Sequence, residues 1–368
     1  MKVLYLTNIP SPYRVDFFNE LGKYCELTVL YERSNASDRD KSWTSNKASH
    51  FTPVFMKGFK ITQDSAICPS VIRWLRRDKY DAIVVGGYST PTGMLAIRTL
   101  RARKIPFFLN IDGGFIKQDG FLSSKIKKYF IGSATWWLSS GLETNKYLRH
   151  YGADPDHIHV YPFTSLMESD IYPSGATDEE RARLRSQLGI ANEKVVLAVG
   201  QFIPRKGFDL LIDAWSSMPP DYRLILVGSG PDENEYKKRI AELGLSNIRI
   251  EGFKSKEELR SYYRSADLFV MPTREDIWGL VVNEALSCGL PVVSTDKCIA
   301  ALEFARKSEG IHIVPADDQA ALARTIRYAC EDDRLRHEFS SAALRVMDEH
   351  TIEAMAQKHV SIFKECVS

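Results

Sequence analysis

Short apolar runs alternate with longer amphipathic stretches along the whole chain, a pattern typical of strands alternating with helices. In the first half, strands are expected at residues 2–7, 26–31, 81–85, 106–110, 135–139 and 157–161, and helices at 13–23, 70–77, 92–103, 122–131 and 143–151. In the second half, strands are expected at 195–200, 223–227, 248–251, 268–271, 290–294 and 310–314, and helices at 207–216, 232–243, 256–264, 280–287, 319–330, 334–349 and 352–365. This order predicts an α/β fold with parallel sheets covered by helices.

The alternation is interrupted by the stretch 166–190, in which Pro173, Ser174 and Gly175 indicate a linker. The sequence therefore predicts a first domain over residues 1–165 and a second over residues 191–350. The length of 368 residues accommodates two domains of ordinary size.

Composition narrows the class of protein. The net charge of +2 and the charged fraction of 26% are ordinary for a soluble protein. The chain contains no apolar run of the roughly 18 residues that a membrane-spanning helix needs. Its first residues resemble a buried strand rather than a signal peptide, so a cytoplasmic location is expected. The six cysteines form no CxxC pair, so neither a zinc site nor a redox motif is indicated.

Charge is distributed unevenly along the chain. Residues 1–165 contain 23 Lys and Arg against 14 Asp and Glu, whereas the remainder is acidic. A basic first domain favours an anionic membrane surface or a phosphorylated acceptor, although solvated faces without a partner explain it equally well. The stretch 123–131 mixes lysines with apolar residues, which favours peripheral attachment at the inner face of the cell membrane. Nothing in the pattern indicates a nucleic-acid partner.

The most informative segment is Thr273 to Val293, TREDIWGLVVNEALSCGLPVV. Two carboxylates, Asp276 and Glu284, stand on either side of a predicted helix start near Gly279. A helix N-terminus holds phosphate through its unpaired N–H groups, and carboxylates accept hydrogen bonds from sugar hydroxyls. This combination suits a nucleotide sugar, in which sugar, diphosphate and ribose lie in a row.

This segment resembles the Glu-x7-Glu signature of the family 4 retaining glycosyltransferases. Gly279-Leu280, Glu284-Ala285, Gly289 and Pro291-Val292 match that pattern, while Asp276 replaces its first Glu. The resemblance implies a GT-B fold: two Rossmann-like parallel-sheet domains facing each other across a cleft. It also implies a terminal helix, here about residues 351–368, that crosses back to the first domain.

A second stretch resembles the G-R-x-x-x-x-K-G motif of the same family. Gly200 and Lys206 match it, whereas Gln201 stands in place of the usual Arg, and Arg205 is a candidate to supply the missing charge. A solvated basic turn is the alternative interpretation. The residues expected to contact the donor are Gly200, Gln201, Arg205, Lys206, Gly228, Phe253, Asp276, Gly279, Leu280, Val281 and Glu284.

The resemblance assigns roles to these residues. Lys206 and Arg205 would hold the diphosphate. Backbone N–H groups from Gly279 to Val281 would hold its distal phosphate. Glu284 would accept the ribose hydroxyls, and Asp276 those of the transferred sugar. The family works with retention and without a metal or other cofactor, so the nucleotide diphosphate sugar is expected to be the co-substrate.

The acceptor side is less specific. Many family members carry a His near the reacting sugar, and Asp112 stands at the comparable strand end. Its expected roles are to orient the acceptor hydroxyl or to stabilise the anomeric carbon, with a turn Asp as the alternative. Arg14 is either a second acceptor-side candidate or a surface residue. Tyr88 is a third acceptor-side candidate. The residues expected to act in catalysis are Asp276, Lys206 and Asp112.

These observations predict a retaining glycosyltransferase that uses a nucleotide sugar, with UDP-sugar favoured, and a saccharide or lipid-linked glycan acceptor in bacterial surface polysaccharide synthesis. Two alternatives are a nucleotide-sugar epimerase of the same fold and a non-catalytic nucleotide-sugar-binding protein. A nicotinamide dehydrogenase is disfavoured because Asn8–Arg14 lacks the G-x-G-x-x-G loop.

Overall fold

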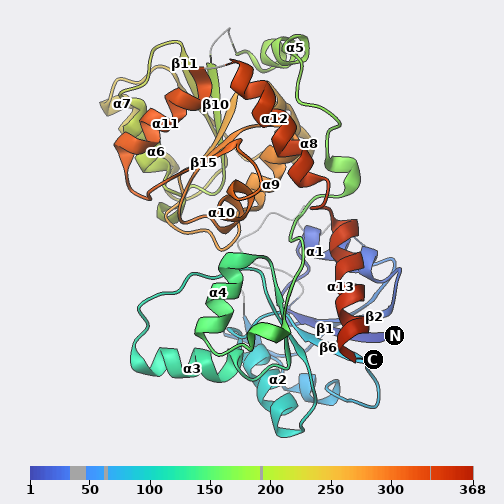
Figure 1. Cartoon of the computed structure of the whole chain (residues 1–368). Helices are drawn as coiled ribbons and strands as arrows, with labels where there is room; N and C mark the ends of the chain where they lie inside the picture. Colours follow the sequence, from blue (N-terminus) through green and yellow to red (C-terminus); the bar gives the residue numbers. More distant parts are fainter. Residues whose placement is uncertain (34–46, 62–64, 191–193, 332, 368) are drawn as a thin grey trace. The chain divides into compact units, whose positions relative to one another are not determined.

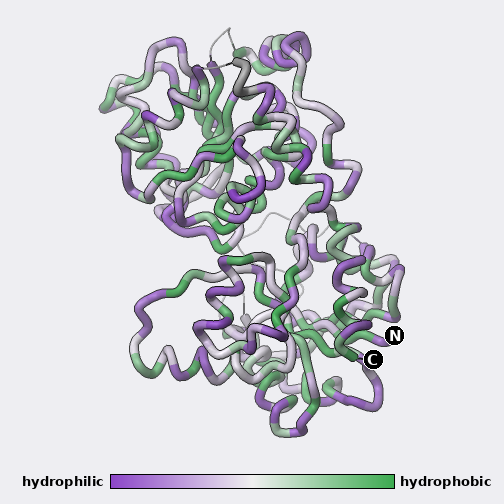
Figure 2. Tube along the Cα trace, in the orientation of Figure 1, coloured by the Kyte–Doolittle hydropathy of each residue, from purple (hydrophilic) through white to green (hydrophobic). Residues whose placement is uncertain are grey.

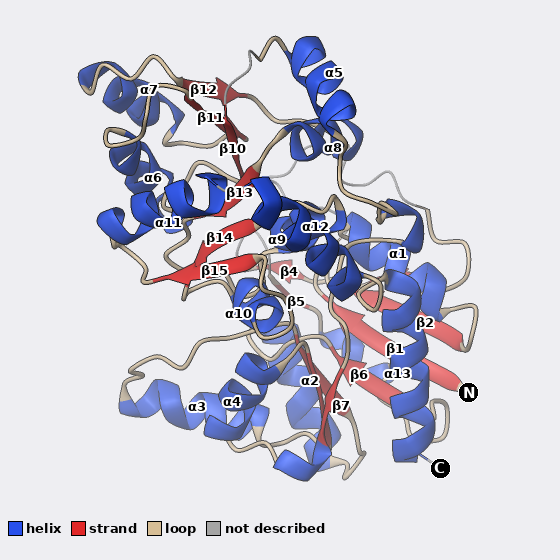
Figure 3. Ribbon diagram, turned by 45° about the horizontal axis from the view of Figure 1, so that its top comes forward, coloured by secondary structure: helices blue, strands red, loops and turns tan. Residues whose placement is uncertain are grey.

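The computed structural model describes residues 1–33, 47–61, 65–190, 194–331 and 333–367, without the side chains of 333–336. The chain forms two compact units, Met1–Met167 with His350–Ser368 (unit 1) and Glu168–Glu349 (unit 2). Unit 2 is therefore inserted between two parts of unit 1. Each unit contains a parallel sheet flanked by helices, which confirms the predicted α/β class (Figures 1 and 3).

Unit 1 is built on a parallel sheet whose described strands follow the order β3-β2-β1-β6-β7-β8-β9. The strands are β1 (Lys2–Thr7), β2 (Glu26–Tyr31), β3 (Thr52–Phe55), β6 (Ala82–Val85), β7 (Phe108–Ile111), β8 (Trp136–Ser139) and β9 (Ile158–Val160). Beside this sheet, β4 (Phe59–Lys60) and β5 (Ala66–Ile67) form an antiparallel pair. Strands β3, β4 and β5 were absent from the sequence prediction.

The helices of unit 1 are α1 (Pro12–Leu21), α2 (Pro91–Ala102), α3 (Phe121–Ile131), α4 (Leu142–His150) and α13 (Ile352–Val367), with the 3₁₀ helices η2 (Pro69–Arg73) and η3 (Pro155–His157). The helix expected at 70–77 is wrong in type and length, because the 3₁₀ turn starts at Pro69 and ends at Arg73. Helix α13 packs on α1, with the ring of His359 4.8 Å from that of Phe17. The terminal helix thus belongs to unit 1.

Unit 2 contains a second parallel sheet in the order β12-β11-β10-β13-β14-β15. Its strands are β10 (Lys194–Val199), β11 (Tyr222–Val227), β12 (Ile248–Glu251), β13 (Leu268–Met271), β14 (Val292–Thr295) and β15 (Ile311–Val314). The helices are η4 (Glu168–Asp170), α5 (Asp178–Leu188), η5 (Pro204–Lys206), α6 (Phe208–Trp215), α7 (Glu233–Glu242), α8 (Lys256–Ser265), α9 (Leu280–Ser287), α10 (Ile299–Ala305), α11 (Gln319–Glu331) and α12 (Asp333–Met347).

The central strands of both sheets are continuous apolar runs because helices cover them on both faces. In β10, residues Val195 to Val199 are all buried. Figure 2 shows the hydrophobic residues concentrated in the strands and the hydrophilic ones along outer helix faces and loops. Burial of these apolar strands supplies the main stabilisation of each unit.

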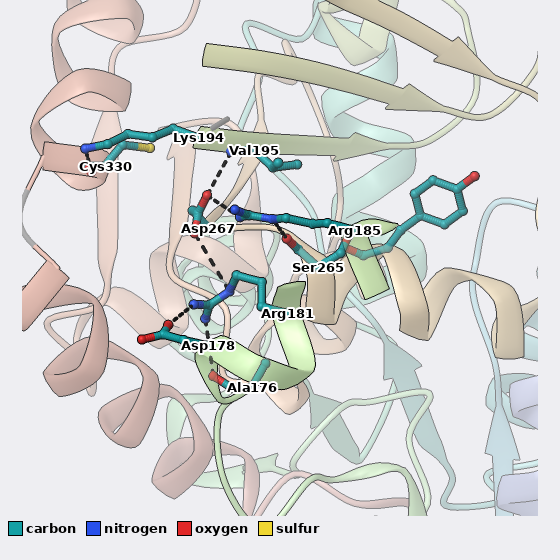
Figure 4. Close-up of polar contacts among 10 residues, drawn as sticks. Ala176, Asp178, Arg181, Arg185, Lys194, Val195, Ser265, Asp267 and Cys330 are labelled. Atoms are coloured by element: carbon teal, nitrogen blue, oxygen red, sulfur yellow. Dashed lines mark hydrogen bonds and ion pairs between the residues drawn. The ribbon is translucent and has the colours of Figure 1, made fainter. Parts of the chain in front are cut away.

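Helix α5 lies inside the stretch that was expected to be a linker, and ion pairs hold it against the sheet of unit 2 (Figure 4). Arg185 Nη2 donates to Asp267 Oδ2 at 2.5 Å, and the same oxygen accepts the N–H of Val195 at 2.8 Å. Arg181 Nε lies 3.8 Å from Asp267 Oδ1. These contacts tie the helix to β10 and to the turn before β13, so the segment forms part of unit 2.

Candidate donor site in unit 2 and polar cluster in unit 1

The strand order of unit 2 places two loops at the position where parallel sheets usually bind ligands. Neighbouring strands β10 and β13 connect to helices in opposite directions along the sheet, and the crevice at such a switch point is the usual ligand position. The loop after β10 carries Gly200, Arg205 and Lys206. The loop after β13 carries Asp276 and Gly279.

Hydrogen bonds join these two loops directly. The carbonyl oxygen of Arg205 accepts from the N–H of Arg274 and from Thr273 Oγ1, both at 2.9 Å. Gly207 adopts φ +69°, and a Cβ there would lie 2.1 Å from the carbonyl oxygen of Pro272. A side chain is therefore excluded at Gly207, and this close approach keeps η5 against the end of β13.

The approach brings Lys206 and Asp276 into contact. Lys206 Nζ donates to Asp276 Oδ2 at 2.5 Å, and Arg205 Nη1 lies 4.0 Å from the same oxygen. Both side chains of the closer pair are mostly buried, with 13% and 12% exposed. From the sequence, Lys206 is expected at the diphosphate and Asp276 at the sugar, whereas in the structure the two side chains contact each other.

Helix α9 begins four residues after Asp276, at Leu280, with Gly279 as its N-cap residue at φ +101°. A Cβ on Gly279 would lie 2.7 Å from Cys298 Sγ, so both the backbone conformation and the space require glycine. No side chain caps this helix end. Its first N–H groups and its partial positive charge thus lie beside two cationic side chains.

Glu284 lies one turn further along α9 and contacts Tyr263 of α8. Tyr263 donates its hydroxyl hydrogen to Glu284 Oε2 at 2.9 Å. Burial raises the pKa of the Glu284 carboxyl above its ordinary value, although the Tyr263 hydrogen bond opposes this rise. Sequence reasoning missed Tyr263 because its partner lies on another helix and no local spacing connects the two.

The remaining donor candidates follow the neighbouring strands. Gly228, after β11, adopts φ +152°, and a Cβ there would lie 1.9 Å from the carbonyl oxygen of Gly200. Gly228 therefore allows the β10 and β11 loops to approach each other. Phe253, after β12, is 57% exposed, and Gln201 is exposed as well.

In unit 1, the acceptor-side candidates Arg14 and Asp112 form a partly buried ion pair, Arg14 Nη2 to Asp112 Oδ2. Asp112 Oδ1 accepts from Asn110 Nδ2 at 2.7 Å and from the Tyr161 hydroxyl at 2.8 Å. Burial acts to raise the pKa of Asp112, but the charge of Arg14 and these hydrogen bonds hold it below its ordinary value. Arg14 is therefore an interior residue, 7% exposed, rather than a surface one.

Tyr88 reaches the same region through Tyr147. The two hydroxyls lie 2.5 Å apart, and a Cβ on Gly114 would lie 2.9 Å from the Tyr147 ring. Tyr147 thus packs on the loop that carries Asp112. Neither Tyr147 nor Tyr161 was a sequence-based candidate.

His359 of α13 lies next to this cluster, with its ring 4.5 Å from that of Tyr161. The side chain is fully buried, and Nδ1 lies 2.7 Å from the carbonyl oxygen of Met355. Nε2 has no hydrogen-bond partner among the described residues. Burial lowers the pKa of His359 to about 4, and the nearby charge of Arg14 acts in the same direction.

Within the described ranges, no three His, Cys, Asp or Glu side chains are placed to hold a metal ion. The same ranges contain no helix long and apolar enough to cross a bilayer.

Residues 180–346 match the family model described as glycosyl transferases group 1. Over these residues the chain is similar to the group 1 glycosyl transferases. We call residues 180–346 the group 1 segment; it contains Lys206, Asp276 and Glu284 of the candidate donor site.

Two curated relatives are similar over part of the chain. Mannosylfructose-phosphate synthase of Agrobacterium fabrum is 34% identical over 202 residues, which cover 51% of this chain and 43% of that protein. A D-inositol 3-phosphate glycosyltransferase of Jonesia denitrificans is 29% identical over 228 residues, covering 58% of this chain and 53% of that protein. The chain spans about half the length of the curated relatives that it matches.

A solved structure resembles the whole chain. Anabaena HepE in complex with UDP and glucose aligns with a TM-score of 0.76 and 19% identity over 99% of both chains. This likeness confirms the predicted GT-B fold.

Proposed function

We propose that the chain is a retaining glycosyltransferase that moves a sugar from a nucleotide diphosphate sugar to a saccharide or lipid-linked glycan. UDP-sugar is the proposed donor class. One observation carries the proposal: the Lys206–Asp276 contact, with Arg205 beside it, precedes the uncapped N-terminus of α9 within the group 1 segment.

The charges of this site suit a diphosphate. Lys206, Arg205 and the end of α9 are positive, and Asp276 offsets only part of that charge. An ammonium has three N–H donors, and the contact with Asp276 occupies one of them. Positive groups held in place in a partly buried site stabilise a leaving diphosphate without further rearrangement. We propose that this happens without a metal ion.

The two carboxylates have separate roles in this proposal. Asp276 orients Lys206 through Oδ2, while Oδ1, which accepts a 3.4 Å hydrogen bond from the N–H of Trp278, retains capacity for a sugar hydroxyl. Glu284 accepts the ribose hydroxyls, with Tyr263 fixing its orientation. Because only the ionised carboxylate is a full acceptor, donor binding should weaken at low pH.

On the acceptor side, we propose that Asp112 is the acting carboxylate and that Arg14 and Tyr161 position it. Asp112 has a side chain 24% exposed, whereas that of Arg14 is 8% exposed and already engaged. The names of the two curated relatives include phosphate-bearing compounds, so a phosphorylated acceptor is a second candidate class. We also propose a role in surface polysaccharide synthesis at the inner face of the cell membrane, with unit 1 in contact with it.

A thermal-shift series with UDP, GDP, ADP and TDP, with NAD as control, tests the donor proposal. We expect UDP and one UDP-sugar to raise the unfolding midpoint, since HepE was solved with UDP and glucose. Incubation of that donor with candidate acceptors, with and without a chelator, then tests transfer, and the anomeric configuration of the product by NMR tests retention. A shift with NAD alone, or none with any nucleotide, would contradict the proposal. Isomerised donor without an acceptor would instead identify an epimerase.

A further inference from the structure

Helix α3 presents an apolar face to solvent at the margin of unit 1, on the side away from α13 (Figure 1). Phe121 is 78% exposed, Leu122 71%, Tyr129 41% and Ile126 40%. Only Phe130 and Ile131 of this helix are buried. Large apolar side chains gathered in this way usually mark an interaction surface rather than ordinary solvated protein surface.

Helical geometry separates the two faces of α3. At about 100° per residue, Phe121, Tyr129, Leu122 and Ile126 fall within an arc of about 140°. Phe130 and Ile131 fall outside this arc and are buried against unit 1. The helix is therefore held to unit 1 by one apolar face and presents a second apolar face outward.

Cationic side chains border this outward face. Lys125 Nζ lies 4.2 Å from the centre of the Phe121 ring, and the Arg101 guanidinium lies 4.7 Å from that of Tyr129. Lys128 is exposed. Lys127 points elsewhere, because its Nζ contacts Asp119 Oδ1 at 2.7 Å. Asp119 is the only acidic residue between positions 113 and 142 of the sequence, so the stretch that contains α3 carries a net positive charge.

We propose that this face docks on an anionic lipid bilayer, with Phe121 and Leu122 in the headgroup boundary and Lys125 and Lys128 over lipid phosphates. A helix that lies in a bilayer surface combines an apolar face with long cationic side chains whose stems lie along it. The core of a protein–protein interface is instead depleted in lysine. Docking would bring unit 1 to an acceptor in the bilayer, and in this respect the inference rests on the proposed function.

Flotation of the full chain with lipid vesicles tests the inference without any transfer reaction. Wild-type protein should float with phosphatidylcholine–phosphatidylglycerol vesicles and much less with phosphatidylcholine alone. The double substitution Phe121→Ser and Leu122→Ser should lower the partition coefficient at least about tenfold. Lys125→Gln with Lys128→Gln should weaken binding to the anionic vesicles and reduce its dependence on salt.

A matched control lies elsewhere in unit 1. Phe59 is 75% exposed and stands between the exposed Lys57 and Lys60, so Phe59→Ser removes a comparable side chain from a comparable environment. Phe59→Ser should leave vesicle binding unchanged. On adding anionic vesicles, a Phe121→Trp variant should show a larger blue shift of its fluorescence than the wild type, whose six Trp supply the background, and the difference reports insertion.

Several outcomes would overturn the inference: no flotation of the wild type, equal flotation of the Phe121→Ser and Leu122→Ser variant, or an equal loss with Phe59→Ser. A concentration-dependent mass that this variant abolishes, without vesicle binding, would assign the face to a second copy of the chain. Calorimetric titration of the same variants with UDP separates the two proposals. Retained UDP binding with no flotation refutes only the docking inference, whereas flotation without UDP binding refutes only the donor site.

Discussion

Replacing His359 with Leu should remove an acid sensitivity from the folding of unit 1. The imidazole is fully buried, and its pKa falls from 6.5 to about 4 in the folded chain. The unfolded chain therefore binds a proton on this ring more tightly than the folded chain does. Above pH 6.5 the ring is neutral in both states, so acid does not lower the unfolding free energy there. Stability is lost as the pH falls from 6.5 towards 4.

The magnitude follows from that pKa difference. At about 1.4 kcal/mol per unit, the change from 6.5 to about 4 corresponds to about 3 kcal/mol of unfolding free energy. The geometry explains the penalty, since a proton on Nε2 would create an N–H with no acceptor among the described residues. The charge of Arg14 next to this cluster adds repulsion, which Asp112 only partly offsets.

Urea unfolding followed by circular dichroism at a series of pH values measures this effect. The wild type should lose about 3 kcal/mol more than His359→Leu between pH 7 and pH 4, whatever their difference at neutral pH. His150→Leu at an exposed position is the control and should follow the wild type. Identical pH dependence in the wild type and His359→Leu would refute the reasoning, as would an imidazole NMR titration near pH 6.5 in the folded chain.

Three further predictions concern the donor side. Lys206→Met leaves the carboxylate of Asp276 without its ammonium and should cost about 3 kcal/mol of unfolding free energy and most UDP binding; adding Asp276→Asn should restore much of the stability but not the binding. Glu284→Gln should weaken UDP binding yet raise the unfolding midpoint at neutral pH, because burial raises the pKa of this carboxyl and the folded chain therefore disfavours its ionised form. Gly279→Ala should destabilise the chain by about 3 kcal/mol, since φ is +101° and the new Cβ would lie 2.7 Å from a sulfur.

Each of these has a control. Additive stability losses in the Lys206 and Asp276 double-mutant cycle would show that the two side chains do not interact. The stabilisation from Glu284→Gln should vanish near pH 4, where the carboxyl is protonated in both states; a gain that persists there would point to packing instead. Gly252→Ala, which meets nothing within 4 Å, should change stability little and serves as the match for Gly279→Ala.

Most strands and most helices follow from local pattern. The run Lys194–Val199 is a strand because five consecutive apolar residues are buried on both faces. The segment from β13 to α9 was located correctly because an apolar run, a glycine and an amphipathic stretch follow each other in sequence. Features of this kind depend on neighbouring residues, and the sequence contains them in full.

Helix α5 escaped prediction because most of its residues are polar. Arg181 and Leu184 are its buried residues, and its clearest signal is the Thr177 side chain, which accepts from the N–H of Glu180. The helix is stabilised by its ion pairs with Asp267, which lies far away in sequence. The spacing of hydrophobic residues along the helix gives no information about a contact of this kind.

The pairs at both sites were unpredictable for the same reason. Lys206 and Asp276 are 70 positions apart, and Arg14 and Asp112 are 98 apart. Motif spacing assigns a residue to a loop, but the partner of its side chain depends on which strands are neighbours and on how closely their loops approach. The sequence therefore left open whether Arg14 is an acceptor-side residue or a surface residue.

The insertion of unit 2 into unit 1 has a consequence for synthesis on the ribosome. Helix α13 emerges only after all of residues 168–349, although its rings cover Phe17 and Phe108 from the first third of the chain. Domains generally fold as units during translation, so we expect unit 2 to complete its fold while unit 1 still exposes these aromatic side chains. We expect a nascent chain at this stage to bind chaperones, and a stop codon before Ile352 would leave residues 1–167 without the helix that completes their unit.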